Sequence, residues 1–432
     1  MRTTRRSWLT LSAGLLGVAL AATGCSGADA ASSATADDNA PVTLSVATFN
    51  EFGYDALYAE YTKLHPNVTI VPKKAATSQE ARDNMNTRLA AGSGLSDIEA
   101  IEVDWLPELM QSSSKFADLT SDETKGRWLD WKTAQATTPD GKLMGYGTDI
   151  GPEAICYRSD LFAAAGLPTD RAAVAKLLGS TWDDYFAVGK QFAAKSKVPW
   201  MDSAGATYNA MVNQLEYAYE NKDGSPIPLD QNTQIKALYD QVLKVGGGDK
   251  LSAHLGEWSE DWTAGFQKNG FATMACPGWM LGVIQGNAAG VKGWDIADTF
   301  PGGGGNWGGS FLTVPEQGKN KAAAIKLAAW LTAPEQQIKA FKAKGTFPSQ
   351  VEALKSPELL GQTNAFFNNA PTGQILATRA AAVKVRAFKG VNYFAIHQIV
   401  GDAIARVDVD KTDDAASSWA KAVTAYNALG LG

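Results

Sequence analysis

The sequence is poor in residues that bind metals or form covalent catalytic centres. Its 432 residues include three histidines and three cysteines. No two histidines have the spacing of a zinc-binding helix, and no Gly-x-Ser-x-Gly sequence marks a serine nucleophile. The glycine-rich run at 302–309 lacks the Lys-Ser/Thr pair that would bind phosphate after it. We expect no metal, no nucleotide and no other cofactor, and we expect this run to be a flexible loop presenting Trp307.

Basic stretches and long apolar stretches are also scarce. The net charge is −6, from 39 Lys and Arg against 45 Asp and Glu, and no basic run interrupts this balance. Nucleic acid is therefore not an expected partner. After the first 25 residues no segment approaches the roughly 18 consecutive apolar residues of a membrane helix. Neutral solutes and other proteins are the expected partners.

The first 25 residues have the pattern of an export signal. Three arginines within the first six residues precede an apolar run over 9–20, and small residues then lead to Cys25. The segment resembles a bacterial lipoprotein signal, which implies cleavage after residue 24 and lipidation of Cys25, although Ala22 stands where leucine is usual. The alternative is an ordinary secretory signal cut a few residues later. The Arg5-Arg6 pair also permits export by the twin-arginine route.

A polar segment separates this signal from the folded protein. Residues 26–40 contain no aromatic or branched aliphatic side chain, so they cannot bury enough apolar surface to offset the entropy of ordering. We expect a flexible tether over 25–41. The remaining chain of about 390 residues is longer than one hydrophobic core usually serves, which favours two domains or lobes.

Hydrophobic periodicity predicts alternating strands and helices. Strands are expected at 42–49, 68–71 and 98–103, with helices between them. This order predicts a mainly parallel sheet with helices on both faces. Later helices are expected at 182–195, from 233 to about 245, at 319–344 with a break at Pro334, and around Trp419 to Tyr426. The fold class is therefore α/β in two lobes.

Helix ends carry recognisable capping residues. Thr77 and Glu80 fit a capping box, and Gly92 marks the end of the same helix. Thr181 and Asn232 are the expected N-caps of two later helices.

Two glycine-flanked extended segments interrupt the alternation, at 145–151 and 308–315. Glycine permits the backbone changes that a hinge must absorb, although it is also common in ordinary turns. We expect the chain to cross between the lobes at these two segments.

Cys156 and Cys276 are the two cysteines that lie beyond the signal and the tether. Each lies in a strand-like run, at 153–158 and 271–276. A disulfide between them requires the two strands to be neighbours, and two buried free cysteines are the alternative.

Aromatic side chains supply the strongest positive signal for function. A sugar has a face of C–H groups and a rim of hydroxyls, so its site needs flat rings together with polar groups at their edges. The candidate rings lie near carboxylates or amides in loop-like contexts; they are Trp258, Trp262, Trp279 and Trp307. Trp279 is favoured because the preceding Pro277-Gly278 exposes its ring at a strand end. The tryptophans on helical patterns are assigned to packing; they are Trp128, Trp131, Trp182, Trp330 and Trp419.

Paired carboxylates beside these rings raise an enzymatic alternative. Glu257 with Glu260 or Asp261 has the residue types of a glycosidase acid and base. Charged residues at a helix start are more often solvated caps, so hydrolysis is the less favoured function.

Several segments, taken in order, carry a family resemblance. They are Thr48-Phe49-Asn50-Glu51-Phe52, the glycine-containing run at 89–94, the segments at 145–152 and 156–168, Trp182-Asp183-Asp184-Tyr185, and 266–279 ending in Pro277-Gly278-Trp279. Together they resemble the maltose-binding-protein-like, carbohydrate-binding group of extracellular solute-binding proteins of bacterial ABC importers. Within that group the chain looks most like actinobacterial binders of cellobiose and cellotriose, then of xylobiose. Chito- and malto-oligosaccharides remain open, and a peptide fits the aromatic content less well.

The resemblance implies a domain organisation and a partner. It implies a first lobe of 42–150 plus 312–363 and a second lobe of 151–311 plus 364–432, closing on a sugar. It places Cys156 and Cys276 on adjacent strands and so favours the disulfide. The liganded protein is expected to be a monomer, lipid-anchored on the extracellular face of the cell membrane, that docks on ABC permease subunits served by a cytoplasmic ATPase.

The resemblance also implies site residues. Trp279 falls on the position that stacks on the sugar, and Tyr393 or Phe394 falls near a second aromatic wall. Polar residues at strand ends are expected to bind hydroxyl groups; they are Asn50, Glu51, Glu102, Asp104 and Asp149.

Overall fold

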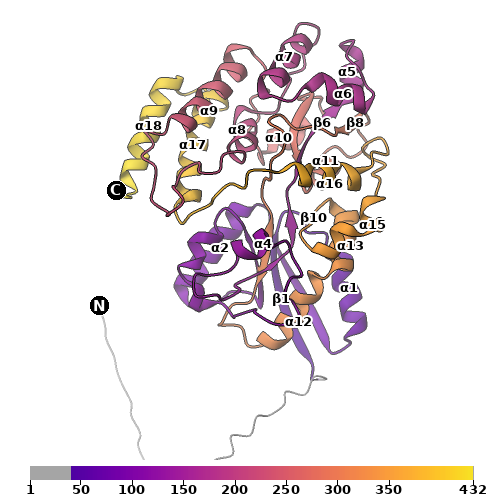
Figure 1. The fold of residues 1–432 in the computed structure, drawn as a ribbon, viewed down its shortest axis with the longest axis vertical. Helices are drawn as coiled ribbons and strands as arrows, with labels where there is room; N and C mark the ends of the chain where they lie inside the picture. The colour runs from indigo at the N-terminus through magenta and orange to yellow at the C-terminus, as the bar shows by residue number, and fades with distance from the viewer. Residues whose placement is uncertain (1–39, 432) are drawn as a thin grey trace, which may run out of the picture. The chain divides into compact units, whose positions relative to one another are not determined.

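The structure is a computed structural model that describes residues 40–431. The predicted signal peptide at 1–24, the predicted lipidation site Cys25 and nearly all of the predicted tether at 25–41 lie outside the described residues. Within the described range, no helix is long and apolar enough to cross a lipid bilayer. As predicted, the fold is α/β and two-lobed, with one principal sheet in each lobe (Figure 1).

The first lobe is built on a five-stranded sheet. In sheet order its strands are β2 (Val68–Ala75), β1 (Val42–Phe49), β3 (Ile98–Glu102), β9 (Ser310–Thr313) and β4 (Tyr146–Gly147). Strand β1 pairs in parallel with β2 and β3, whereas β9 is antiparallel to β3 and β4. The associated helices are α1 (Asp55–Leu64), α2 (Ser78–Ala91), α3 (Leu106–Met110), α4 (Asp130–Gln135) and α12 (Lys321–Leu331), with a 3₁₀ turn at Ser113–Lys115.

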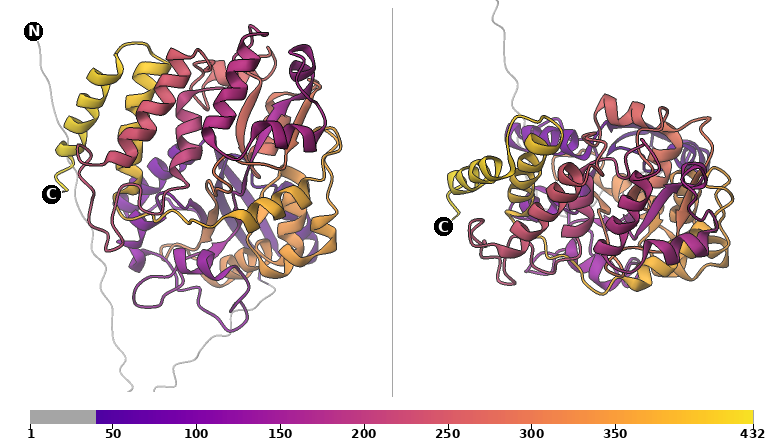
Figure 2. Two further views of the ribbon diagram at one scale, coloured as in Figure 1. Left: turned by 45° about the horizontal axis from the view of Figure 1, so that its top comes forward. Right: turned by 90° about the horizontal axis from the view of Figure 1, so that it is seen from above.

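The second lobe is built on a three-stranded antiparallel sheet. Strand β6 (Glu153–Arg158) lies between β7 (Thr273–Pro277) and β8 (Trp294–Ala297). Its first helices are α5 (Ser159–Ala164), α6 (Arg171–Leu178), α7 (Trp182–Ala193), α8 (Ala204–Val212) and α9 (Thr233–Leu243), followed by a π-helical turn at Lys244–Gly248. The others are α10 (Glu260–Gly265), α11 (Met280–Asn287), α16 (Thr372–Ala382), α17 (Tyr393–Asp408) and α18 (Ala415–Ala428). Helices α17 and α18 pack together beside α8 and α9 (Figure 2).

The prediction of a mainly parallel sheet is correct for β1, β2 and β3 and wrong for the other strands. Successive βαβ crossovers fix a common direction only for the strands within their own run, which here are β1, β2 and β3. Strand β9 reaches the first sheet after the chain has passed through the second lobe, so it can enter in the opposite direction. A long helical connection likewise separates β6 from β7, and the two strands pair antiparallel.

Local capping explains why several helices begin and end where they do. Thr77 Oγ1 accepts a hydrogen bond of 3.1 Å from the Glu80 amide, and Gly92 ends α2 in the left-handed region at φ 66°. The Glu80 carboxylate accepts from the amide of Ala76 rather than from that of Thr77, so the predicted capping box is only half formed. Thr181 forms a complete box with Asp184 at the start of α7.

Residues between the two principal sheets form a small connecting region. Strand β5 (Asp149–Ile150) pairs antiparallel with β10 (Phe347–Pro348). Three helices adjoin it in sequence; they are α13 (Pro334–Lys344), α14 (Val351–Lys355) and α15 (Pro357–Leu360). Pro334 begins α13, as the sequence predicts, because its missing amide hydrogen is not needed in a first turn.

The hydrophobic cores show how closely this region joins the second lobe. Ile338 and Phe341 of α13 belong to the same buried cluster as Cys276, Met280 and Leu281. Strand β9 and helix α12 belong instead to the core of the first sheet. The lobe boundaries at 150, 312 and 363 and the hinges stay predictions.

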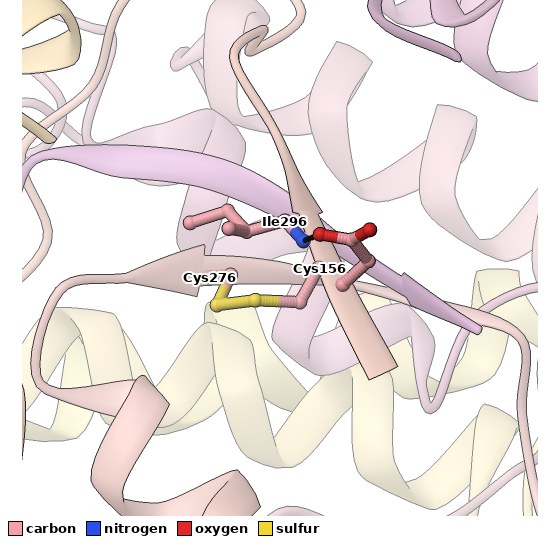
Figure 3. The surroundings of a disulfide bond; sticks show 4 residues. Cys156, Cys276 and Ile296 are labelled. Atoms are coloured by element: carbon pink, nitrogen blue, oxygen red, sulfur yellow. Dashed lines mark hydrogen bonds between the residues drawn. A yellow bond between two sulfur atoms is a disulfide. The ribbon is translucent and has the colours of Figure 1, made fainter. Parts of the chain in front are cut away.

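Cys156 and Cys276 form a disulfide in the structure, between neighbouring strands β6 and β7 (Figure 3). The S–S distance is 2.01 Å, the Cα–Cα distance is 5.5 Å, and the two residues are 120 positions apart. Strand register pairs Cys156 with Met274 and Ala154 with Cys276. Both cysteines are fully buried.

The five tryptophans that the sequence assigned to packing lie in or against the hydrophobic cores, as predicted. Trp128 is 2% exposed in the core of the first sheet. The others are partly buried against hydrophobic clusters; they are Trp131, Trp182, Trp330 and Trp419.

Candidate functional site

A cavity of about 540 Å³ lies where the ends of β1 and β3 face α8, α11 and α17. Its volume is within the range of small-molecule sites. Residues after β1 and β3 supply one part of the lining, and the loop before α10 supplies another. The cavity therefore draws its side chains from segments far apart in the sequence.

Three of the four candidate tryptophans line this cavity, and they contact one another. Trp258 and Trp279 are stacked, with ring centroids 6.0 Å apart and an interplanar angle of 24°. Trp307 meets Trp279 edge to face at 5.5 Å. The indole nitrogen of Trp279 donates a 2.9 Å hydrogen bond to the carbonyl oxygen of Trp307, which fixes the orientation of the ring.

Trp262 does not line the cavity. It is 1% exposed, and its indole nitrogen donates to the Asp202 carboxylate at 2.9 Å. Its ring lies 5.2 Å from that of Trp258. Trp262 therefore packs against Trp258 from the protein interior and not from the cavity. Trp258 itself is 37% exposed and has a φ of 69°, an uncommon backbone conformation for a bulky residue.

Of the two residues predicted for a second aromatic wall, only Phe394 lines the cavity. Phe394 lines the cavity, and the guanidinium of Arg82 lies 4.5 Å from its ring centroid. Tyr393 is 1% exposed and stacks on His397 with centroids 5.6 Å apart. It belongs to the core beneath the cavity.

Glu102, the last residue of β3, and Asp104, two residues further on, line the cavity. One oxygen of Glu102 accepts a 2.8 Å hydrogen bond from the Asp104 amide. Burial, followed by the nearby Asp104 carboxylate, raises the pKa of Glu102 to about 8. Asp104 forms an ion pair with Lys389, whose ammonium also donates to Asn213 Oδ1 at 3.1 Å.

Asp149 lines the cavity but uses its carboxylate within the protein. One oxygen accepts from the Thr148 hydroxyl at 2.8 Å and from the Ser310 amide at 3.0 Å. These bonds tie β5 to the start of β9. Lys132 faces Asp149 from α4, and burial lowers the pKa of this lysine to about 8.

Asn50 and Glu51 line the cavity at the end of β1. Asn50 has a φ of 46°, which asparagine tolerates better than most residues. Its Oδ1 atom is buried and has no hydrogen-bond partner among the described residues. Glu51 forms ion pairs with Lys74 at 2.6 Å and with Lys344 at 3.1 Å. Burial by itself would raise the pKa of Glu51, but the two ammonium groups together lower it below its ordinary value.

Several lining residues were not predicted from the sequence. Beside the predicted Phe394, one face of α17 supplies His397, Gln398, Gly401, Asp402 and Ala405. This spacing of three and four residues is a helical stripe that contains polar side chains, and it could have been noticed. Burial lowers the pKa of His397 to about 4, so its imidazole is neutral at pH 7. Its Nδ1 atom lies 2.9 Å from the Tyr219 hydroxyl.

Glu257 lines the cavity beside Trp258, where the sequence had suggested it only as a hydrolase residue. Its Oε1 atom is buried without a partner, and its other oxygen receives a long 3.4 Å hydrogen bond from Asn209. Burial raises the pKa of Glu257 well above its ordinary value. Glu260 and Asp261 are exposed in the first turn of α10, away from the lining.

Metal binding finds no support in the described residues. No group of three or more His, Cys, Asp or Glu side chains between positions 40 and 431 is arranged to hold a metal ion.

The sequence profile of the bacterial extracellular solute-binding proteins matches residues 56–367. This chain belongs to that family. A crystal structure described as an extracellular solute-binding protein family 1 is 53% identical to it, with a TM-score of 0.78. The match covers 90% of this chain and 99% of that one. A comparison with curated protein sequences gives no match.

Two sugar-bound structures share the fold of this solute-binding protein. The ABC transporter associated binding protein from B. animalis subsp. lactis Bl-04, in complex with β-1,6-galactobiose, is 20% identical with a TM-score of 0.74. The match covers 89% of this chain and 96% of that one. The galacto-N-biose-/lacto-N-biose I-binding protein of Bifidobacterium longum, in complex with lacto-N-biose, is 17% identical with a TM-score of 0.70 and the same coverage of 89% and 96%. At these identities the similarity concerns the fold alone.

Family membership decides between the two functions that the sequence left open. Extracellular solute-binding proteins bind their ligands and do not transform them, so this solute-binding protein is not an enzyme. Glu257 is accordingly a polar group of the cavity lining, and the exposed Glu260 and Asp261 lie in the first turn of α10, whose N-cap is Ser259.

Proposed function

We propose that this protein is the substrate-binding component of an ABC importer and that it captures a short oligosaccharide in the cavity. The observation that carries the proposal is the stacked pair Trp258 and Trp279 beside buried polar atoms that lack protein partners. Those atoms are Asn50 Oδ1, Glu257 Oε1 and Thr346 Oγ1.

This combination suits the chemistry of a sugar. Buried polar atoms without a partner are costly, and a hydroxyl-rich ligand would supply the missing hydrogen bonds. The flat indole of Trp279 offers its face to the C–H side of a pyranose ring. A ligand with no hydroxyl groups would leave Asn50 and Glu257 unsatisfied.

Binding on two sides of the cavity provides the signal for transport. A ligand favours the closed state only if it binds that state more tightly than the open one. Trp279 belongs to the second lobe and Asn50 and Glu102 to the first, so a sugar that touches all three would hold the lobes together. The closed form would then be the one recognised by the permease subunits, with the protein a monomer tethered through a lipid on Cys25 at the extracellular face of the membrane.

Cellobiose or cellotriose is our first candidate ligand, and xylobiose is the second. The sequence resemblance supports this order. The sugar complexes of relatives with the same fold support the wider class of oligosaccharides, since they contain β-1,6-galactobiose, lacto-N-biose and maltose.

A tryptophan-fluorescence titration of the mature protein, from residue 26 onward, tests the proposal. The panel contains cellobiose, cellotriose, xylobiose, chitobiose and maltose. We expect a saturable change with at least one sugar, and the sugar to be recovered uncleaved by chromatography. Absence of any response across the panel would overturn the sugar assignment, and cleavage products would overturn the assignment as a receptor.

A further inference from the structure

A chain of hydrogen bonds runs from the core of the second lobe to the cavity. The hydroxyl of Tyr208 lies 2.6 Å from that of Tyr219, and the Tyr219 hydroxyl lies 2.9 Å from Nδ1 of His397. Both tyrosines are 0% exposed, whereas His397 is partly exposed and lines the cavity. The chain therefore connects two residues that a ligand cannot touch to one that it can.

The buried end of this chain fixes the direction of its hydrogen bonds. The Tyr208 hydroxyl has no other hydrogen-bond partner among the described residues, so its hydrogen has only the Tyr219 oxygen to bond to. The Tyr219 hydroxyl, which has no third partner there, must then point its own hydrogen at Nδ1 of His397. The reverse order would leave the hydrogen of Tyr208 without an acceptor in a place closed to solvent, which is costly.

This order decides which nitrogen of His397 carries the proton. A neutral imidazole has one protonated and one unprotonated nitrogen. Since Nδ1 accepts from Tyr219, the hydrogen lies on Nε2. The ring is neutral at pH 7 because burial lowers the pKa of His397 to about 4. The charged groups that act on it are Asp104 and Lys389, which form an ion pair with each other.

The imidazole ring is also held in a fixed orientation. It stacks on the rings of Tyr393 and Tyr208, with centroids 5.6 and 6.0 Å away and interplanar angles of 14° and 19°. Its Nε2 atom forms no hydrogen bond with any residue between 40 and 431 and is not enclosed by protein. This nitrogen is therefore free to contact a ligand in the cavity.

Two other nitrogen donors of the lining are already used within the protein. Trp279 Nε1 donates to the Trp307 carbonyl at 2.9 Å, and Gln337 Nε2 donates to the Gly147 carbonyl at 2.8 Å. Sugar hydroxyls accept hydrogen bonds as well as donate them, so a lining with many carboxyl groups still needs donors. Nε2 of His397 supplies a donor whose direction is set before the ligand arrives.

We infer that His397 donates a hydrogen bond from Nε2 to an oxygen atom of the bound sugar, and that Tyr219 and Tyr208 are positioning residues that fix this tautomer without touching the ligand. Because the donor is oriented in the free protein, binding does not have to order it. The inference rests on the proposed function and adds a specific contact to the same site.

Long-range ¹H–¹⁵N NMR of the mature protein, labelled with ¹⁵N-histidine and measured at pH 7, reads the tautomer without any ligand. The chain has three histidines, and the resonances lost in His397→Gln are those of His397. We expect a protonated Nε2 and an unprotonated Nδ1 in the native protein. Tyr219→Phe keeps the ring but removes the donor to Nδ1, so the tautomer should shift toward a mixture.

Tyr217→Phe is the matched control for that substitution. It makes the same chemical change two residues away, at a ring that packs on Phe388 outside the cavity lining. Its hydroxyl does not belong to the chain that ends at His397, so the tautomer should stay as in the native protein.

Isothermal titration calorimetry measures the contact with the sugar. The probe is whichever of cellobiose, cellotriose, xylobiose, chitobiose and maltose binds most tightly. His397→Leu removes the donor and should weaken binding at least about tenfold, whereas the amide of His397→Gln can still donate and should recover part of that loss. Tyr219→Phe should weaken binding about threefold, because the donor is no longer held in one tautomer. Tyr217→Phe should bind as the native protein does, and circular dichroism checks the fold of each variant.

The outcomes separate the inference from the function on which it rests. A native His397 with its proton on Nδ1, or doubly protonated at pH 7, would overturn the inference and leave the receptor function intact. Unchanged sugar affinity in His397→Leu would overturn the contact with the ligand, and an unchanged tautomer in Tyr219→Phe would overturn the positioning role. Absence of binding by every sugar in the panel would overturn both the proposed function and the contact.

Discussion

The indole nitrogen of Trp279 and the carbonyl oxygen of Trp307 are joined by a 2.9 Å hydrogen bond. This bond connects the ring at the end of β7 to the glycine-rich segment that returns toward the first sheet. Gly151 lies against the same carbonyl, since a Cβ atom there would be 1.7 Å from the Trp307 oxygen. The orientation of the Trp279 ring is thus tied to the predicted hinge segment at 145–151 and to the residue that precedes the second predicted hinge segment at 308–315.

Replacement of Trp279 should weaken sugar binding without unfolding the protein. Trp279→Ala removes the ring that stacks on Trp258 in the cavity lining, so we expect the affinity for the bound sugar to fall more than tenfold. Trp279→Phe retains a smaller ring and should lose less. Calorimetry gives the affinities, and circular dichroism checks the fold. An alanine variant that binds as the native protein does would remove Trp279 from the site.

A single added methyl group at Gly308 should obstruct the platform. Gly308 has a φ of 77°, and a Cβ atom there would approach Trp279 Nε1 to 3.2 Å. Gly308→Ala should therefore lower both the affinity for sugar and, by about 1 kcal/mol, the stability of the fold.

Gly303→Ala is the matched control for that substitution. Gly303 lies in the same glycine-rich run with a φ of 100°, but a Cβ atom there meets nothing within 4 Å. It should show the stability loss while keeping the affinity. Equal affinity losses in the two variants would point to general loop strain instead of contact with Trp279.

Removal of the disulfide should lower the melting temperature. The bond closes a segment of 120 residues, and restricting the unfolded chain in this way stabilises by up to about 4 to 5 kcal/mol on entropic grounds. The double variant Cys156→Ala, Cys276→Ala should melt several degrees below the oxidised protein in differential scanning calorimetry. Because both cysteines are fully buried, the variant is a cleaner test than added reductant. Identical melting curves would argue against the bond.

Glu102 should make the stability of the unliganded protein depend on pH. Its pKa rises from 4.5 to about 8 on folding. Between these values the folded protein holds a proton that the unfolded chain has released, so stability falls as pH rises through this window. The loss is at most about 1.4 kcal/mol per pH unit.

Glu102→Gln tests this dependence, because glutamine does not ionise. The melting temperature of the variant, relative to that of the native protein, should increase from pH 5 to pH 8. Glu352→Gln, at an exposed carboxylate outside the cavity lining, is the matched control and is measured over the same pH range. A constant difference for Glu102→Gln would contradict the raised pKa.

Local sequence determined much of the secondary structure. Val42–Phe49 and Glu153–Arg158 form strands at their predicted positions, because each is a short run of strand-forming residues with clear boundaries. Thr181, Asn232 and Pro334 begin helices as expected, since the hydrogen bonds of a cap involve only the next few residues. Trp279, which lines the cavity, could be proposed from the sequence because a strand end and the Pro-Gly pair before the ring are both local signals.

Tertiary structure alone decided which side chains meet in the cavity. Trp258 and Trp262 stand four residues apart beside similar neighbours, yet only Trp258 lines the cavity, because Trp262 packs inward against Asp202. Phe394 and Tyr393 are adjacent, and the rotation of α17 sends one to the cavity and the other to the core. Asp104 and Lys389 are 285 residues apart, so their ion pair exists only once the two lobes and their connections have folded. Composition and spacing could therefore predict a sugar-binding, two-lobed protein, whereas the charge that its cavity presents to a ligand depends on contacts that no local pattern records.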